Sequence, residues 1–76
     1  MESISKEKAV FAFMHNATRE LVENFSQALL DSAGIKSRID RFPNNYILFV
    51  SENDYYKALS EGSLLAELNH IVLFWV

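Results

Sequence analysis

The sequence predicts an α+β fold in two layers, with a four-stranded antiparallel sheet covered on one face by two helices. Hydrophobic residues recur with strand or helix periodicity in the order strand, helix, strand, strand, helix, strand. Half of the 76 residues are hydrophobic, which supports a packed core in a single domain covering residues 1–76. Right-handed crossovers and short connections then favour one topology, a βαββαβ sandwich with the first and third strands at its centre.

The first predicted strand and helix occupy the N-terminal half of the chain. Residues 8–15, KAVFAFMH, are apolar and rich in aromatic side chains, which is typical of a strand. Asn16 or Thr18 can cap the helix that follows, because either side chain accepts a hydrogen bond from a free backbone N–H group. Apolar residues recur at helical spacing until Gly34, which we expect to end the helix in the left-handed conformation of a Schellman cap.

A hairpin is predicted next, because the hydrophobic period changes to two. Residues 35–40 and 46–50 have the pattern of its two strands. The segment between them, RFPNNY, contains a proline and two asparagines, which favour turns.

The second helix is predicted to begin at Ser51, with Asp54 completing a capping box. Gly62 is expected to break or bend this helix, and Ser63 to cap a last helical turn. Residues 71–76, IVLFWV, form the last strand, which the topology places at an edge of the sheet. Together these elements make the arrangement known as the ferredoxin-like sandwich.

The predicted sheet carries more apolar surface than one layer of helices covers. An antiparallel sheet with one face in water alternates apolar and polar residues, and the second strand does so through Lys36, Arg38 and Asp40. The other three strands are apolar on both faces, and the N-terminal residues 1–7, MESISKE, are too polar to cover them. We therefore expect several large apolar side chains on the uncovered face, which usually marks an interaction surface.

A second copy of the chain is the simplest cover for that surface, and a ligand, another protein or a different topology are the alternatives. The last strand has no charge, proline or glycine after His70, although natural edge strands usually carry such protection. It can pair edge to edge with its copy in an eight-stranded sheet, or help two sheets pack face to face. The predicted partner or dimer interface comprises Phe11, Phe13, Phe49, Ile71, Leu73, Phe74 and Trp75.

Charge is distributed unevenly. The chain has ten acidic and seven basic residues, and most acidic residues fall on the predicted helices. The outer side of the first helix can be a solvated surface, or it can dock on a basic partner through charge complementarity. This acidic helical face comprises Glu20, Glu23, Asn24, Gln27 and Asp31.

Several classes of function are disfavoured. There is no cysteine and no cluster of histidines, so we expect no metal site and no cofactor. No catalytic motif is found, and we expect no enzyme activity. The longest apolar runs are five or six residues, too short to cross a membrane, and the first ten residues lack the apolar core of a signal peptide, so the cytoplasm is the expected location. The net charge of −3 disfavours nucleic acid, although aromatic residues on the two central strands would suit RNA stacking.

Two stretches resemble a known pattern. Residues 29–35, LLDSAGI, and residues 50–59, VSENDYYKAL, are similar to segments of small bacterial domains described as signal-transducing proteins, and of the cytoplasmic N-terminal domain of some rhomboid proteases. The last strand departs from these families, and the resemblance supplies no catalytic residue. It implies a regulatory or interaction module.

These observations favour a small non-enzymatic interaction module, homodimeric, that regulates or inhibits a protein partner. A concrete version is an acidic inhibitor of the kind that phages and mobile elements encode, which blocks a basic surface. A regulatory domain that senses a small ligand is the alternative, followed by an RNA-binding module.

Overall fold

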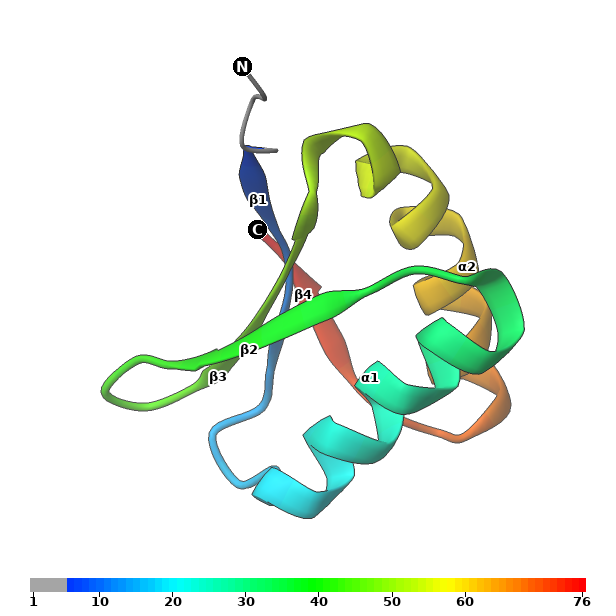
Figure 1. Cartoon of the computed structure of the whole chain (residues 1–76). Coiled ribbons are helices and arrows are strands. Elements are labelled where there is room, and N and C mark those ends of the chain that lie inside the picture. The colour runs from blue at the N-terminus through cyan, green and yellow to red at the C-terminus, as the bar shows by residue number, and fades with distance from the viewer. Residues whose placement is uncertain (1–5) are drawn as a thin grey trace.

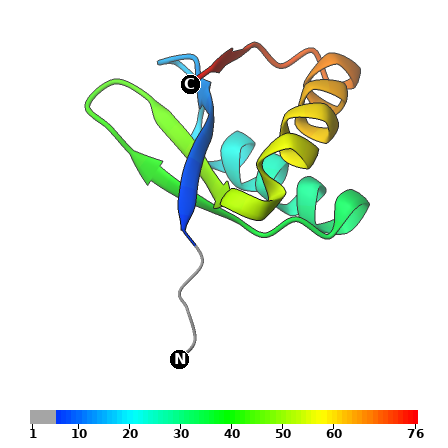
Figure 2. The same ribbon diagram turned by 90° about the horizontal axis from the view of Figure 1, so that it is seen from above.

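The computed structural model describes residues 6–76, so residues 1–5 of the polar N-terminal segment lie outside the described part. The four strands form one antiparallel sheet in the order β2-β3-β1-β4. Both helices lie on the same side of this sheet (Figures 1 and 2). The predicted ferredoxin-like sandwich is confirmed, with the first and third strands at its centre. In chain order the elements are β1 (Glu7–Phe13), α1 (Arg19–Ala33), β2 (Ser37–Arg41), β3 (Tyr46–Ser51), a 3-10 turn (Glu52–Asp54), α2 (Tyr55–Leu68) and β4 (Leu73–Trp75).

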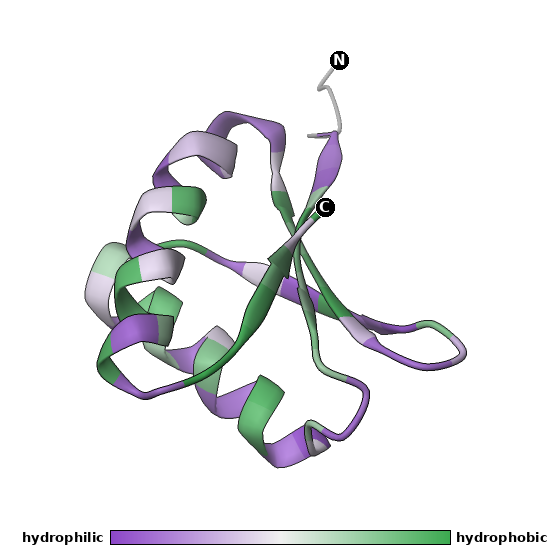
Figure 3. Cartoon of the chain, turned by 180° about the vertical axis from the view of Figure 1, so that it is seen from behind, coloured by the Kyte–Doolittle hydropathy of each residue, from purple (hydrophilic) through white to green (hydrophobic). Residues whose placement is uncertain are grey.

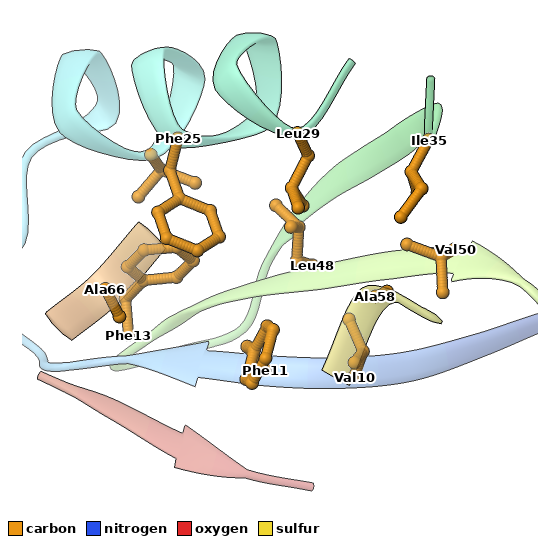
Figure 4. Packing of buried hydrophobic residues seen from close by; sticks show 11 residues of the cluster. Val10, Phe11, Phe13, Phe25, Leu29, Ile35, Leu48, Val50, Ala58 and Ala66 are labelled. Carbon is orange, nitrogen blue, oxygen red and sulfur yellow. The ribbon is translucent and has the colours of Figure 1, made fainter. Parts of the chain in front are cut away.

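The hydrophobic core fills the space between the sheet and the helices (Figure 4). Phe25 of α1 packs edge-on against Phe11 and Phe13 of β1, with ring centroids 6.2 and 5.4 Å apart. The prediction that Phe11 and Phe13 contribute to an interface is therefore wrong, because both side chains are fully buried beneath the helices. The buried residues are Val10, Phe11, Phe13, Val22, Phe25, Leu29, Ile35, Leu48, Val50, Ala58 and Ala66.

A β-bulge in β1 explains why this strand is apolar along its length. Ala9 pairs with Phe49, and the next register pair joins Phe11 to Leu48, so Val10 is an extra residue. The bulge lets Val10 and Phe11 both point into the core, where both are fully buried. An uninterrupted strand would have turned one of them to the open face, since its side chains alternate.

The ends of α1 follow the sequence signals. Of the two candidate caps, Thr18 is the one used, and its Oγ1 accepts a hydrogen bond from the Leu21 N–H at 3.1 Å. Gly34 ends the helix with φ 69°, in the left-handed region, as predicted. Its N–H donates to the Leu30 carbonyl at 2.9 Å, the bond of the αL motif, and the Ile35 N–H donates to the Leu29 carbonyl at 3.3 Å, so the two bonds of the Schellman pattern are not the ones formed.

Helix α2 departs from the prediction because it runs through Gly62 unbroken, so the expected break there and the cap at Ser63 are wrong. Gly62 is buried against β1, and a Cβ atom at this position would lie 2.3 Å from Cε2 of Phe11. The glycine therefore permits close helix–sheet packing. Ser51 does cap the turn that precedes α2, accepting from the Asn53 N–H at 3.3 Å.

The Schellman pattern is found at the end of α2. His70 adopts φ 56° and donates its N–H to the Glu67 carbonyl at 3.3 Å. The Ile71 N–H donates to the Ala66 carbonyl at 2.8 Å, which completes the pair of bonds. This turn redirects the chain from α2 into β4.

The predicted hairpin of β2 and β3 is present, and its loop projects beyond the helices (Figure 1). Phe42 and Asn45 exchange backbone hydrogen bonds of 2.8 and 3.2 Å around a two-residue loop of Pro43 and Asn44. The side chain of Asn45 reaches back to the sheet, where Nδ2 donates to the Phe13 carbonyl at 2.6 Å. The hairpin is thereby fastened to the end of β1.

Candidate interaction surface

The sheet face turned away from the helices is the first part of the candidate surface. Strand register and side-chain alternation give it two alanines on β1, apolar residues on β3 and β4, and charged residues on β2. The small side chains of Ala9 and Ala12 lie at its centre. Its main members are Ala9, Ala12, Arg38, Asp40, Ile47, Phe49 and Phe74.

The β2 side of this open face is covered by an ionic network of the chain itself. Arg38 Nε lies 2.9 Å from Glu7 Oε1, and Arg38 Nη1 lies 3.4 Å from Asp40 Oδ2. The guanidinium sits 4.6 Å from the centroid of the Phe49 ring, within cation–π distance. The hydrogen bond from Glu7 raises the pKa of Arg38, whose charge is already permanent. Phe49 is consequently half-buried rather than bare.

Strand β4 and the valines on either side of it remain uncovered. Val72, Phe74, Trp75 and Val76 are 55%, 52%, 71% and 57% exposed. Figure 3 shows the hydrophobic colour along β4, which faces the viewer there. In the described part of the chain β4 pairs with β1 alone, so its other backbone edge has no strand beside it.

Exposed side chains of β4 point to both sides of the sheet. Phe74 pairs with Ala12 and lies on the open face, whereas Trp75 pairs with the buried Phe11 and lies on the helix side. On that side, a shallow, open hollow of about 350 Å³ lies between α2 and β4. It is lined by Ser63, Ala66, Glu67, Ile71, Leu73 and Trp75.

The predicted interface residues divide into four groups. Phe74 and Trp75 are exposed where an interface needs them, and Ile71 and Leu73 are half-buried against the core. Phe11 and Phe13 belong to the core, and Phe49 lies beneath Arg38. Sequence reasoning missed Val72 and Val76 as separate members, although both share the period-two position of Phe74.

The acidic helical face forms a second, separate surface. Glu20, Glu23, Asn24, Gln27 and Asp31 are all exposed on α1. Arg19 Nε contacts Glu23 Oε2 at 3.1 Å, and Gln27 Nε2 donates to Asp31 Oδ1 at 2.9 Å. Helix α1 packs on α2, β2 and β3, so this face lies on a different element from β4, and Glu20 and Asn24 at its edge line a cleft that also includes Ile71.

A cleft of about 410 Å³ lies between α1 and α2. Two residues of the acidic helical face, Glu20 and Asn24, line it together with Asn69 from the end of α2. Apolar residues close its floor, so the cleft combines polar groups with a hydrophobic base. The apolar lining comprises Leu21, Phe25, Ala28, Leu65 and Ile71.

The chemistry of the remaining surface is plain. Residues 6–76 contain no buried polar or charged side chain and no group of three or more His, Cys, Asp or Glu residues placed to hold a metal ion. Over the same residues, no helix has the length and apolar character needed to cross a membrane. On the open face the central strands present Ala9, Ala12, Ile47 and Phe49, and Phe49 lies beneath the Arg38 guanidinium.

Comparisons of the chain with protein-family models, with curated proteins and with solved structures give no match.

Proposed function

We propose that the chain is a small non-enzymatic protein-interaction module that acts as a homodimer and regulates or inhibits a protein partner. The observation that supports this most strongly is the row of exposed apolar side chains on β4, beside an unpaired backbone edge. Burying one large apolar side chain is worth roughly 1.5–3 kcal/mol. In a domain this small that surface is a costly feature unless another molecule covers it.

Dimerisation through β4 would leave the acidic helical face free for the regulated partner. The two surfaces are on different elements, and each dimer would present two acidic helical faces. A basic surface on the partner, such as one that binds nucleic acid, would complement them. The proposal thus includes an acidic inhibitor of phage or bacterial type that works in the cytoplasm.

The resemblance of residues 29–35 and 50–59 to bacterial signal-transducing and rhomboid N-terminal domains supports the same role. Those segments form the end of α1 and the start of α2. They shape the fold and contain no group that we assign to catalysis.

The dimer is tested by measuring mass in solution with light scattering. We expect a dimer for the natural chain and a monomer for Phe74→Glu, which would bury two carboxylates in the interface. The matched control is Phe42→Glu, because Phe42 is 43% exposed but lies at the hairpin tip. A natural chain that remains monomeric at the highest concentration contradicts the homodimer.

The acidic helical face is tested by comparing two charge reversals in binding to proteins of the source cell. Glu20→Lys should weaken retention of a basic partner by about tenfold, a coupling typical of close charge pairs across an interface. Glu52→Lys makes the same charge change at an exposed site outside α1 and should have little effect. Equal effects of the two reversals would rule out a specific role for the acidic helical face.

A small-ligand sensor is the second candidate, and the cleft between α1 and α2 favours it. Its volume of about 410 Å³ is in the range of small-molecule sites, and Asn24 and Asn69 offer convergent polar groups. Amino acids and nucleotides should then raise the melting temperature, and Asn24→Leu should remove that rise. If none of these ligands shifts the melting temperature, the sensor has no support.

A further inference from the structure

We infer that the homodimer forms by antiparallel pairing of β4 with β4 of a second copy, about a two-fold axis at Phe74. In this arrangement Trp75 of each copy enters the hollow between α2 and β4 of the other. The inference rests on the proposed homodimer and adds the geometry of its interface. The dimer would be one continuous eight-stranded sheet with all four helices on the same side.

The two edges of the sheet differ in a way that selects β4. The edge strand β2 carries Arg38, Asp40 and Arg41, and charged side chains are a common protection of natural edges. Residues 71–76 carry no charge and no proline. Pairing with a second sheet is therefore disfavoured at the β2 edge, whereas the β4 edge has no such protection.

The sequence of β4 is self-complementary when it pairs with its own copy. With the axis at Phe74, each Phe74 faces Phe74 of the second copy, and Leu73 faces Trp75. Val72 then faces Val76, and the Leu73–Trp75 and Val72–Val76 pairs each occur twice because of the symmetry, whereas the Phe74 pair on the axis occurs once. Apolar side chains meet apolar side chains at every position on both sides of the sheet.

The hollow accounts for the exposure of Trp75. Leu73 and the chain's own Trp75 line the hollow, and in the proposed dimer the residue that pairs with Leu73 on the same side of the sheet is Trp75 of the second copy. Ser63 and Glu67 line the same hollow, and their oxygens can accept the indole N–H, which needs a partner when it is buried. The hollow thus offers both apolar contact and an acceptor.

The area is consistent with a dimer that dissociates on dilution. An aromatic side chain buries roughly 150–250 Å², so Phe74 and Trp75, 52% and 71% exposed, together offer on the order of 250 Å² per copy. A standard interface buries about 800 Å² on each partner. The valines, the lining of the hollow and the paired backbone would have to supply the rest.

Face-to-face packing of two open sheet faces accounts for fewer of these observations than edge pairing of β4 does. That mode would bury the network of Arg38, Glu7 and Asp40, and desolvating ionic groups is unfavourable. It would also leave Trp75 in water, because Trp75 lies on the helix side of the sheet.

Tryptophan fluorescence distinguishes the two modes, since Trp75 is the single tryptophan of the chain. On raising the concentration of the natural chain we expect the emission to shift to shorter wavelength in step with dimer formation by light scattering. Phe74→Glu should remove the shift. A dimer whose Trp75 emission does not shift would overturn the edge geometry and leave the homodimer standing.

Disulfide trapping tests the register, and the absence of native cysteine makes single substitutions unambiguous. Under oxidation Phe74→Cys should form a covalent dimer, because residues opposed in an antiparallel pair have Cα atoms about 4.5–5.5 Å apart, within disulfide range. Val72→Cys alone should not, because its copy lies four residues away, about 13 Å. A mixture of Val72→Cys and Val76→Cys should crosslink again.

The outcomes separate the two proposals. A monomeric natural chain overturns both the homodimer and the edge pairing. If the natural chain is dimeric but Val72→Cys crosslinks as readily as Phe74→Cys, the register is wrong and the homodimer still stands.

Trp75→Ala should raise the dissociation constant of the dimer at least about tenfold, as truncation of an aromatic hot spot does. Tyr56→Ala should not raise it, although Tyr56 is 79% exposed.

Discussion

Two residues, Gly62 within α2 and His70 just after its end, show how a single side chain can meet or oppose the demands of its position. Gly62 is buried where a Cβ atom would collide with Phe11, so the absence of a side chain is required by packing. His70 has a side chain in the left-handed conformation, where glycine is preferred. Both positions favour glycine, Gly62 because of packing and position 70 because of backbone conformation, so Gly62→Ala and His70→Gly should change stability in opposite directions.

Gly62→Ala should destabilise the fold by about 1–3 kcal/mol, because the new methyl group overpacks the contact with the Phe11 ring. In an exposed helical position the same change would stabilise by up to about 1 kcal/mol, so the sign is informative. Urea unfolding gives the free energy. Ser60→Ala on the exposed side of α2 is the control, and Phe11→Leu should relieve part of the cost in the double variant. A stabilising Gly62→Ala would contradict the close packing.

His70→Gly should stabilise the fold by about 0.5–1 kcal/mol, because it relieves the left-handed conformation while keeping the two backbone bonds of the cap. Gly34→Ala is the reciprocal control and should cost about 1 kcal/mol. At Gly34 a Cβ would meet nothing within 4 Å, so the cost there is one of backbone conformation. Chemical denaturation gives the free energy of unfolding of both variants. If the two substitutions change this free energy in the same direction, the explanation from the left-handed backbone conformation is wrong.

At the scale of elements, irregular features position the strands. The bulge at Val10 turns two consecutive side chains of β1 inward, and the Asn45 side chain ties the hairpin to the end of that strand. These features act between segments far apart in the sequence. They decide which side chains of an apolar strand are left for the surface.

Asn45→Ala should cost about 1 kcal/mol, because it removes the donor to the Phe13 carbonyl at 2.6 Å. Asn44→Ala in the same loop should be nearly neutral. Asn45→Asp should cost more than Asn45→Ala above about pH 5, since a carboxylate would then face the carbonyl oxygen. Thermal unfolding of the three variants measures these effects. If Asn44→Ala is as unstable as Asn45→Ala, the stabilisation comes from the loop as a whole and not from the Asn45 side chain.

At the scale of the whole molecule, the sandwich leaves the last strand as an uncovered apolar edge of the sheet, in addition to the exposed Leu64 and Leu68 of α2. The helices shield one face, the Arg38 network covers part of the other, and β4 is left between them. A partner that covers β4 would therefore add its binding free energy to a domain too small to bury much surface alone.

The melting temperature should accordingly depend on protein concentration. Tenfold more protein contributes about 0.7 kcal/mol per chain in a dimer, which corresponds to a rise of up to about 3–6 °C for a domain of this size. Phe74→Glu should melt at a temperature independent of concentration, and Phe42→Glu should behave like the natural chain. A concentration-independent melting temperature for the natural chain, across the range in which light scattering detects dimer, would disagree with stabilisation by assembly.

Local pattern was enough to predict the order of the elements, the left-handed Gly34 and the two-layer fold, and to narrow the cap of α1 to Asn16 or Thr18. It was also enough to identify Phe74 and Trp75 as surface candidates. Each of these depends on periodicity or on hydrogen bonds within a few residues, which the sequence contains directly.

The tertiary structure alone decided which apolar residues are buried and what Gly62 does. Phe11 and Phe13 fit either face of a strand by period alone, and the bulge and the contact with Phe25 place them inside. Gly62 has the pattern of a helix breaker until α2 lies against Phe11. The two-layer packing also leaves the apolar last strand as an uncovered edge of the sheet. The sequence could not show this, because a local pattern holds no information about which distant side chain fills the space above a strand.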